Sequence, residues 1–288
     1  MTYPYAHPDC QPQAAEKGAP VPADAFGSGD RLCAAGSADA ATAPHLPGED
    51  DPKQRLYRLF GPEALGRLAA SRVAVFGLGG VGSWCMEALA RGGVGALVLV
   101  DGDRVALSNI NRQAIAFRDT VGQRKVEAAA QLVRRIDPAI QLQLYDRFVL
   151  SKDVPALLDE MGPVDYVADC IDSIATKLAL AQAAQDRGFA LISSAGGANK
   201  VCPDLVQVAD IARTVNDPIC RILRKECRKR GIRRLQMVYT PEHPVPVPMA
   251  PGTARKERTN LGTSSFVPPI MGMTMAGAII RQLTGIES

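Results

Sequence analysis

The sequence predicts an α/β fold, in which a mainly parallel, twisted sheet carries helices on both faces. Two observations predict it: short apolar runs alternate with longer helical patterns along most of the chain, and a cluster of glycines joins the first apolar run to a helix. This alternation is typical of parallel sheets, because each parallel strand needs a crossover connection, usually a helix, before the next strand begins.

The expected elements follow one another regularly from about residue 51. We expect helices over 53–71, 80–91, 122–136, 152–161 and 175–188, and strands over 72–77, 96–101, 140–146, 165–170 and 190–195. Most of these strands are short runs of Val, Leu, Ile and Ala, as expected for strands buried on both faces. Beyond residue 196 the alternation weakens, and residues 204–210 and 235–240 are expected to add antiparallel strands on either side of a basic helix.

Residues 1–50 differ in composition from the rest of the chain. They are rich in Ala, Pro and Gly, contain few branched aliphatic residues and have no helix or strand period. Such a segment buries too little apolar surface to offset the entropy lost on ordering. We therefore expect a disordered extension over 1–50 and one folded domain over 51–288.

Positive charge is concentrated in one segment. The formal net charge is only +3, yet residues 221–234 hold eight Lys or Arg and a single Glu. Clustered basic side chains attract phosphate backbones whatever the base sequence, so this segment is a candidate nucleic-acid contact. The candidate residues are Arg224, Lys225, Arg228, Lys229, Arg230 and Arg233. The alternative is an ordinary solvated helix face.

Cysteine spacing and hydropathy argue against a zinc-binding, a secreted or a membrane-spanning protein. Seven cysteines occur without a C-x-x-C pair, so no structural zinc is expected. Free thiols and the absence of a secretory pattern favour a cytoplasmic protein. The apolar stretch 266–280 is shorter than the roughly 20 residues of a membrane span, and we expect it to form a buried terminal helix. Weak membrane association through this helix is the alternative.

The glycine cluster predicts a nucleotide-binding loop. Gly77, Gly79 and Gly82 fit G-x-G-x-x-G between a strand and a helix, and Gly80 is an additional glycine. In a Rossmann-like fold such a loop brings backbone and a helix amino terminus to phosphates, and a carboxylate after the next strand binds a ribose hydroxyl. Asp101 has that position. At this point NAD and ATP fit equally well.

Polar residues further along the chain favour ATP over NAD. They are Asp103, Ser108, Asn109, Arg112, Lys125 and Asp172. Two cations and an additional carboxylate suit a reaction on a triphosphate, because cations offset charge on the phosphates while a carboxylate holds Mg²⁺. A hydride transfer needs neither. The alternative is that Arg112 and Lys125 are solvated surface charges and that Asp172 caps a helix.

These motifs resemble the ThiF/MoeB/HesA superfamily of ATP-dependent adenylating enzymes, relatives of the ubiquitin-activating enzyme. The resemblance covers about residues 55–288 and is carried by "GLGGVGSW", "SNINRQ", "DYVADCIDS" and "ISSAGGANKVCPDLVQVADIARTVNDP". The GVGSW piece and the spacing of Asp210, Thr214, Asp217 and Pro218 are similar to the branch that dehydrates threonylcarbamoyladenosine in tRNA. The alternative branch activates the carboxyl terminus of a ubiquitin-like sulfur-carrier protein.

The resemblance implies a part for each residue of the site. Gly77, Gly79, Gly80, Gly82, Asp101 and Asp103 would bind adenosine and its ribose, and Ser108, Asn109, Arg112 and Lys125 would contact the phosphates. Asp172 would hold Mg²⁺ near the α-phosphate. Arg58 matches an arginine that reaches the partner's site, which implies a homodimer, although Arg55 is an alternative counterpart.

The resemblance also bears on cysteine chemistry and partners. As we align the chain, Met237 stands where other dehydratases have a cysteine, and a thioether is not a nucleophile. Cys202, Cys220 and Cys227 are interpreted as small buried residues rather than substitutes for it. The candidate partners are tRNA, a second copy of the chain, and a sulfur-relay protein or cysteine desulfurase.

Overall fold

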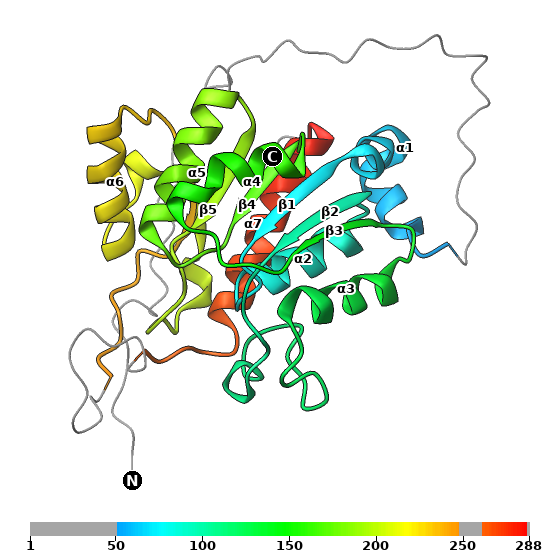
Figure 1. Ribbon diagram of the computed structural model, residues 1–288, viewed down its shortest axis with the longest axis horizontal. Coiled ribbons are helices and arrows are strands. Elements are labelled where there is room, and N and C mark those ends of the chain that lie inside the picture. Colours follow the sequence, from blue (N-terminus) through cyan, green and yellow to red (C-terminus); the bar gives the residue numbers. More distant parts are fainter. Residues whose placement is uncertain (1–50, 248–260, 287–288) are drawn as a thin grey trace.

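The structure is a computed structural model that describes residues 51–247 and 261–286. The expected disordered extension over 1–50 lies outside the described residues. Within them the chain forms one sheet with helices on both faces, which confirms the predicted α/β fold (Figure 1).

The sheet has seven strands in the order β3-β2-β1-β4-β5-β7-β6. The strands are β1 Arg72–Phe76, β2 Ala96–Val100, β3 Gln141–Tyr145, β4 Tyr166–Asp169, β5 Ala190–Ser194, β6 Gln207–Asp210 and β7 Gln236–Tyr239. All neighbouring strands from β3 to β7 are parallel, and only β6 and β7 pair antiparallel. The expectation of two antiparallel additions was therefore wrong for β7, because β6 runs opposite to β5 and the connection through the basic helix reverses the chain direction again.

The helices are α1 Gln54–Ala70, α2 Gly82–Arg91, α3 Lys125–Ile136, α4 Val154–Met161, α5 Ile174–Arg187, α6 Pro218–Arg230 and α7 Val267–Thr284. The expected first helix is kinked at Gly61, whose φ of 78° is not helical and which precedes Pro62. The other helices begin and end within a few residues of the expected positions.

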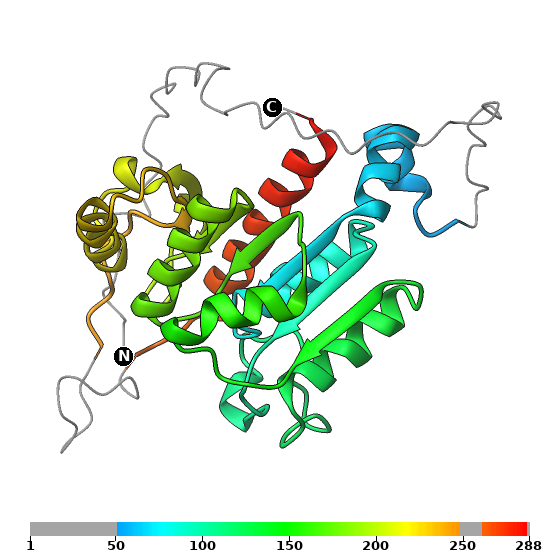
Figure 2. The ribbon, with the colours of Figure 1, turned by 45° about the horizontal axis from the view of Figure 1, so that its top comes forward.

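The helices divide between the two faces of the sheet. Leu97, Leu99 and other residues on one face pack against α2, α3 and α7. Val98, Val100 and their neighbours on the opposite face pack against α4 and α5. Figure 2 shows α4 and α5 in front of the strands and α7 behind them. Successive side chains of β2 therefore point to opposite faces of the sheet and contribute to two separate hydrophobic cores, as expected for a sheet covered on both faces.

The terminal helix α7 is buried, as expected. Met271, Met275 and Ile279, one or two turns apart, are fully buried against α2 and the sheet. No helix within residues 51–247 and 261–286 is long and apolar enough to span a membrane. Because the apolar side chains of α7 are used in the core, the alternative of membrane association through this helix is not supported.

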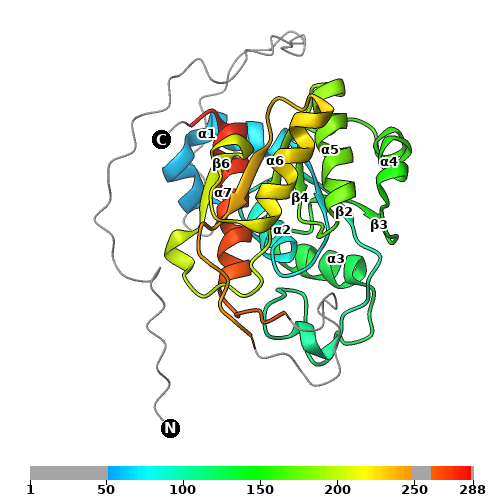
Figure 3. The same cartoon turned by 90° about the vertical axis from the view of Figure 1, so that its left-hand side faces the viewer.

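The basic helix α6 packs on α5 at one side of the sheet (Figure 3). Cys220, Leu223 and Cys227, spaced three and four residues apart, form its buried face. Most of the remaining residues are charged, although Ile222 is also exposed. This division makes α6 an amphipathic helix with a basic exposed face.

Candidate functional site

The strand order reverses between β1 and β4, and we call the region beyond the carboxyl ends of these two strands the crevice. These strands are parallel neighbours, but the chain leaves β1 toward α2 on one face and leaves β4 toward α5 on the other. Ligands of open α/β sheets bind beyond the carboxyl ends of the strands at such a point. The predicted glycine loop follows β1 and lies at this edge.

Two glycines of the loop are required by close backbone approach. Gly77 has a φ of +86°, and a Cβ there would lie 3.0 Å from the carbonyl oxygen of Cys170. A Cβ on Gly82 would lie only 1.7 Å from the carbonyl oxygen of Gly77. A Cβ on Gly79, by contrast, would meet no atom within 4 Å. Gly77 and Gly82 therefore shape the turn, whereas Gly79 leaves open space above it.

Asp101 holds the glycine loop from the end of β2. Its Oδ2 accepts a hydrogen bond from the Leu78 N–H at 2.6 Å, and its Oδ1 accepts one from the Asp103 N–H at 2.8 Å. Lys125, at the start of α3, is nearly buried and forms an ion pair with Asp103 at 2.9 Å. Its ammonium is also 3.8 Å from Asp101 Oδ2. The structure thus brings Asp101, Asp103 and Lys125 together, and Lys125 is not a solvated surface charge.

Arg112 lies against the glycine loop. A Cβ on Gly80 would be 3.4 Å from Cδ of Arg112. The indole Nε1 of Trp84 donates to the Arg112 carbonyl oxygen at 2.9 Å, and Arg112 Nη1 donates to the Ser108 carbonyl oxygen at 3.0 Å. The turn Leu107–Asn109 that precedes it is stabilised by Asn109 Oδ1, which accepts from the Ala106 N–H. Ser108, Asn109 and Arg112 therefore belong to one polar loop beside the glycines.

Asp172 is exposed on the loop between β4 and α5. The cap of α5 is Ser173, whose hydroxyl oxygen accepts a hydrogen bond from the Thr176 N–H, so Asp172 is not the helix cap. The carbonyl of Cys170, two residues earlier, abuts Gly77. This contact brings the loop of Asp172 next to the glycine loop.

A single carboxylate is compatible with Mg²⁺ beside phosphates. The described part of the chain contains no group of three or more His, Cys, Asp or Glu that could hold a metal by itself. Mg²⁺ at nucleotide sites is commonly bound by one or two carboxylates together with phosphate oxygens and water. Asp172 fits that arrangement.

Sequence reasoning missed a buried polar cluster behind this loop. Asp169, Lys177 and Ser193 are at most 2% exposed. Lys177 Nζ lies 3.1 Å from both Asp169 Oδ2 and Ser193 Oγ. The available signal was a lysine inside the apolar stretch "ATKLALA", because a charged side chain on a buried helix face needs a partner.

Arg58 does not reach the crevice of its own chain. It is an exposed residue of α1, which precedes the amino end of β1 and lies near the carboxyl end of α7, where Arg67 Nη2 donates to the Thr284 carbonyl oxygen. The glycine loop lies at the opposite edge, beside Pro268 at the start of α7. Arg55 is on the same helix and is also exposed.

The candidate tRNA-binding residues differ in their surroundings. Arg224 is half-buried: its Nε donates to the Ile211 carbonyl oxygen at 2.9 Å and its Nη2 donates to Thr214 Oγ1 at 2.6 Å. Lys229 pairs with Glu226 at 2.8 Å. Lys229 is exposed, and so are the other four, Lys225, Arg228, Arg230 and Arg233. Arg224 thus holds the turn before α6, and the exposed residues form the basic surface.

The buried cysteines near β7 are poor nucleophiles. Burial and, next in size, the neighbouring Asp217 carboxylate raise the pKa of Cys220 to about 12. Burial also raises the pKa of Cys227. Met237 is completely buried in the same core cluster, and Cys202 is buried as well. A thiol acts as a nucleophile only when ionised, so neither Cys220 nor Cys227 is prepared for covalent catalysis.

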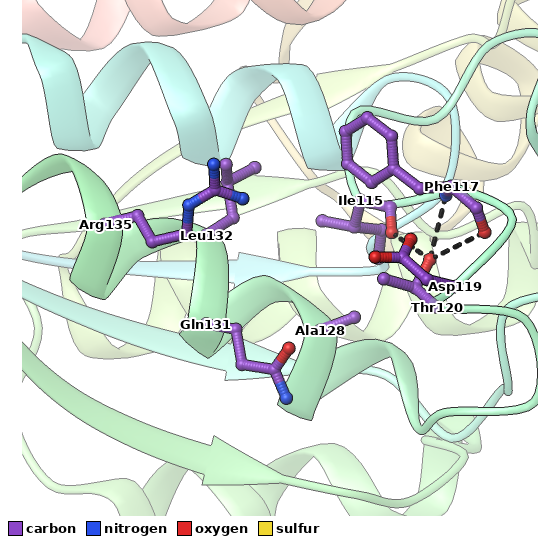
Figure 4. A pocket seen from close by; sticks show the side chains of 8 residues that line it. All are labelled: Ile115, Phe117, Asp119, Thr120, Ala128, Gln131, Leu132 and Arg135. Atoms are coloured by element: carbon purple, nitrogen blue, oxygen red, sulfur yellow. Dashed lines mark hydrogen bonds between the residues drawn. The ribbon is translucent and has the colours of Figure 1, made fainter.

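Two adjoining hollows lie beside the crevice rather than in it. The smaller, of about 270 Å³, is lined by residues of α3 and of the loop 115–120, where Thr120 Oγ1 bonds the Ile115 and Phe117 backbone (Figure 4). The larger, of about 640 Å³, extends from there to Trp84 and Arg91 of α2. Gln113 lines it, and within residues 51–247 and 261–286 Oε1 of this buried side chain has no hydrogen-bond partner. Residues of the loop that carries Arg112 line part of both hollows.

The fold and the crevice define a nucleotide-binding protein of the Rossmann-like class, with paired acidic and basic side chains around its glycine loop. The ThiF family model matches residues 53–288, and the chain belongs to the ThiF family. The predicted family is therefore confirmed.

Within this family, the chain is similar to proteins that are named as tRNA threonylcarbamoyladenosine dehydratases. The tRNA threonylcarbamoyladenosine dehydratase of Bacillus subtilis is 37% identical over 233 residues, which cover 78% of this chain and 91% of the relative. The Escherichia coli protein of the same name is 39% identical over 171 residues, 59% of this chain and 63% of the relative. A crystal structure of the E. coli enzyme TcdA in complex with ATP matches with a TM-score of 0.71 and 32% identity, covering 81% of this chain and 95% of that one.

Proposed function

We propose that this protein is an ATP-dependent tRNA threonylcarbamoyladenosine dehydratase. The observation that carries the proposal is the crevice itself: a glycine loop, the Asp101–Lys125–Asp103 cluster, Arg112 and Asp172 meet at one edge of the sheet. Its relatives over most of the chain bear this name, and one of them binds ATP in a matching fold.

The first step is adenylation of a carboxylate. A carboxylate oxygen of the threonyl group attacks the α-phosphorus of ATP, a new O–P bond forms, and pyrophosphate leaves. Arg112 and Lys125 offset the negative charge that develops on the phosphates, because fixed cations are most effective where charge increases in the transition state. Asp101 binds the ribose while it holds the glycine loop. Asp172 would hold Mg²⁺, which would supply further charge neutralisation.

The second step is ring closure. The carbamoyl oxygen or nitrogen of the same modified base attacks the activated carbonyl carbon, AMP leaves, and a proton is lost to solvent. Both reacting groups belong to one side chain, so proximity already favours the step. A protein thiol is unnecessary, which agrees with the buried, protonated state of Cys220.

The proposal includes three further features. The exposed residues Lys225, Arg228, Arg230 and Arg233 bind the tRNA backbone, whose phosphates they attract without regard to base sequence.

Arg58 completes the site of a second copy of the chain, since α1 lies away from the crevice of its own chain. The buried Oε1 of Gln113, in the hollow beside Arg112, has no partner among the described residues and supports a homodimer contact there, because a buried polar atom needs a partner. Since tRNA and ATP are both available in the cytoplasm, we place the enzyme there.

Pyrophosphate release tests the reaction. Purified protein with Mg²⁺ and ATP should release pyrophosphate with tRNA that carries threonylcarbamoyladenosine, and mass spectrometry of its nucleosides should detect a product lighter by one water. Unmodified tRNA and a ubiquitin-like sulfur-carrier protein are the matched controls. Release only with the carrier protein would instead assign the chain to the sulfur-carrier branch.

A further inference from the structure

A buried polar cluster connects the ends of β4 and β5 to α5. Asp169 is the last residue of β4, Ser193 lies opposite it in register on β5, and Lys177 comes from α5. The Asp169 and Ser193 side chains are completely buried, and Lys177 is 2% exposed. Ser193 Oγ donates to Asp169 Oδ2 at 2.5 Å, and Lys177 Nζ lies within 3.1 Å of both.

Stability alone explains such a cluster poorly. Taking two charges out of water is costly, and a buried ion pair commonly stabilises a fold no more than apolar side chains of similar volume would. The cluster also lies immediately behind the loop that carries Asp172. We therefore considered what the ion pair does to that loop.

Lys177 ties the two ends of the loop together. Its backbone N–H donates to the Ser173 carbonyl oxygen at 3.0 Å, while its ammonium donates to the Asp169 carbonyl oxygen at 3.3 Å and to the Asp169 carboxylate. Residues 170–172 are thus enclosed between Asp169 and Ser173. Within the loop, the Ile171 N–H donates to the free side of the same carboxylate, Oδ1, at 3.2 Å.

The enclosed loop also touches the nucleotide loop. The Cys170 N–H donates to the Phe76 carbonyl oxygen at 2.8 Å, and the Cys170 carbonyl lies against Gly77. A change at Lys177 therefore reaches Asp172 through Cys170 and Ile171, two residues that have little freedom to absorb it. Long-range adjustment of the sheet is not required.

We propose that Lys177 and Asp169 are positioning residues that fix the Asp172 carboxylate relative to the glycine loop, and that Ser193 orients the Asp169 carboxylate for this purpose. The inference rests on the proposed function in one respect: it takes Asp172 as the residue that meets Mg²⁺ and ATP. The position of the loop does not depend on that assignment.

Hydrogen exchange of the full chain tests the position of the loop. In Lys177→Met, amides of residues 170–173 should exchange at least tenfold faster than in the wild type, and in Lys177→Arg the increase should be smaller. Lys200→Met is the matched control, because Lys200 is an equally buried lysine that pairs with Asp217 at 3.9 Å, on another part of the carboxyl edge. It should leave exchange at 170–173 unchanged. If Lys177→Met does not fold, Ser193→Ala removes one hydrogen bond and should increase exchange by a smaller factor.

Calorimetry of ATP binding tests the consequence for the site. In the wild type Mg²⁺ should tighten ATP binding, and in Lys177→Met this tightening should fall at least fivefold, while the Kd measured in EDTA changes less than twofold. Lys200→Met should keep the wild-type ratio. Unchanged exchange at 170–173 in Lys177→Met and Ser193→Ala, or a wild-type ratio in Lys177→Met, would overturn the positioning. A wild-type protein that binds no ATP would overturn the proposed function instead, and the exchange result would still decide the positioning.

Discussion

Lys125 forms an ion pair with Asp103 at 2.9 Å, and its ammonium group is 3.8 Å from Asp101. The two carboxylates differ in setting: the Asp101 side chain is 9% exposed and that of Asp103 is 53% exposed. Only Asp101 also accepts a hydrogen bond from the glycine loop. The same lysine thus has one structural partner and one that solvent can replace.

This difference predicts unequal effects of two matched substitutions. Asp101→Ala should raise the KM for ATP at least tenfold, because it removes both the ribose ligand and the support of Leu78. Asp103→Ala should raise it less than threefold, since solvent can replace the exposed Asp103 carboxylate while Lys125 keeps Asp101 as a neighbouring carboxylate. Steady-state kinetics of AMP release measures both. Equal effects would show that Asp103 has a direct part in binding.

The glycine loop predicts a separation of stability from binding. Gly82→Ala should lower the free energy of unfolding by about 1–3 kcal/mol or more, because its Cβ would collide with the Gly77 carbonyl oxygen. Gly79→Ala should leave the Tm nearly unchanged and weaken ATP binding, since its Cβ projects into open space. Thermal unfolding and calorimetry measure the two. Gly66→Ala is the control, because Gly66 lies within α1 and a Cβ there would meet no atom within 4 Å. This substitution should lower neither the Tm nor the affinity for ATP.

The placement of α1 predicts complementation between inactive variants. Arg58→Ala and Asp172→Asn should each be inactive alone, but an equal mixture, unfolded and refolded together, should recover about a quarter of wild-type activity. Half the dimers are then mixed, and one site in each is intact. The same experiment with Arg55→Ala decides which arginine acts. No recovery with either would argue against an arginine supplied by the partner.

The basic face of α6 predicts a change in the salt dependence of tRNA binding. Lys225→Glu combined with Arg228→Glu should weaken tRNA binding. It should also reduce the magnitude of the slope of log K against log salt by about one to two, because fewer counterions are released when the protein contacts fewer phosphates. Filter binding at several salt concentrations measures the slope. Arg134→Glu with Lys152→Glu makes the same charge change at exposed positions on other elements and should have little effect. Equal slopes in the two variants would exclude α6 from the tRNA contact.

The raised pKa of Cys220 predicts a loss of stability in alkali. The pKa of the Cys220 thiol is about 12 in the folded protein, whereas in the unfolded chain it is near 9. Its contribution is therefore present below pH 9 and is lost as the pH rises toward 12. Between pH 8 and pH 10, urea unfolding of the wild type should lose about 1 kcal/mol more than that of Cys220→Ala. Cys220→Ala should also keep its dehydratase activity.

Local patterns in the sequence were sufficient for the parallel core of the fold and for the residues around the glycine loop. Glycine spacing, short apolar strands and helical periodicity are properties of neighbouring residues, so they are visible without knowing how the chain packs. They predicted β1 to β5 and placed Gly77, Asp101 and Asp172 at strand ends. The carboxyl ends of parallel strands meet at one edge, so the crevice followed from these positions.

Only the tertiary structure decided which partners meet across the fold. The parallel pairing of β7 with β5 depends on where the connection through α6 returns the chain to the sheet, and Arg224 binds the Thr214 turn because α6 packs against that turn. The cluster of Asp169, Lys177 and Ser193 joins two neighbouring strands to a helix, and no spacing in the sequence fixes that distance. Burial makes these contacts strong and specific, because a charge removed from water must find its partner within the protein.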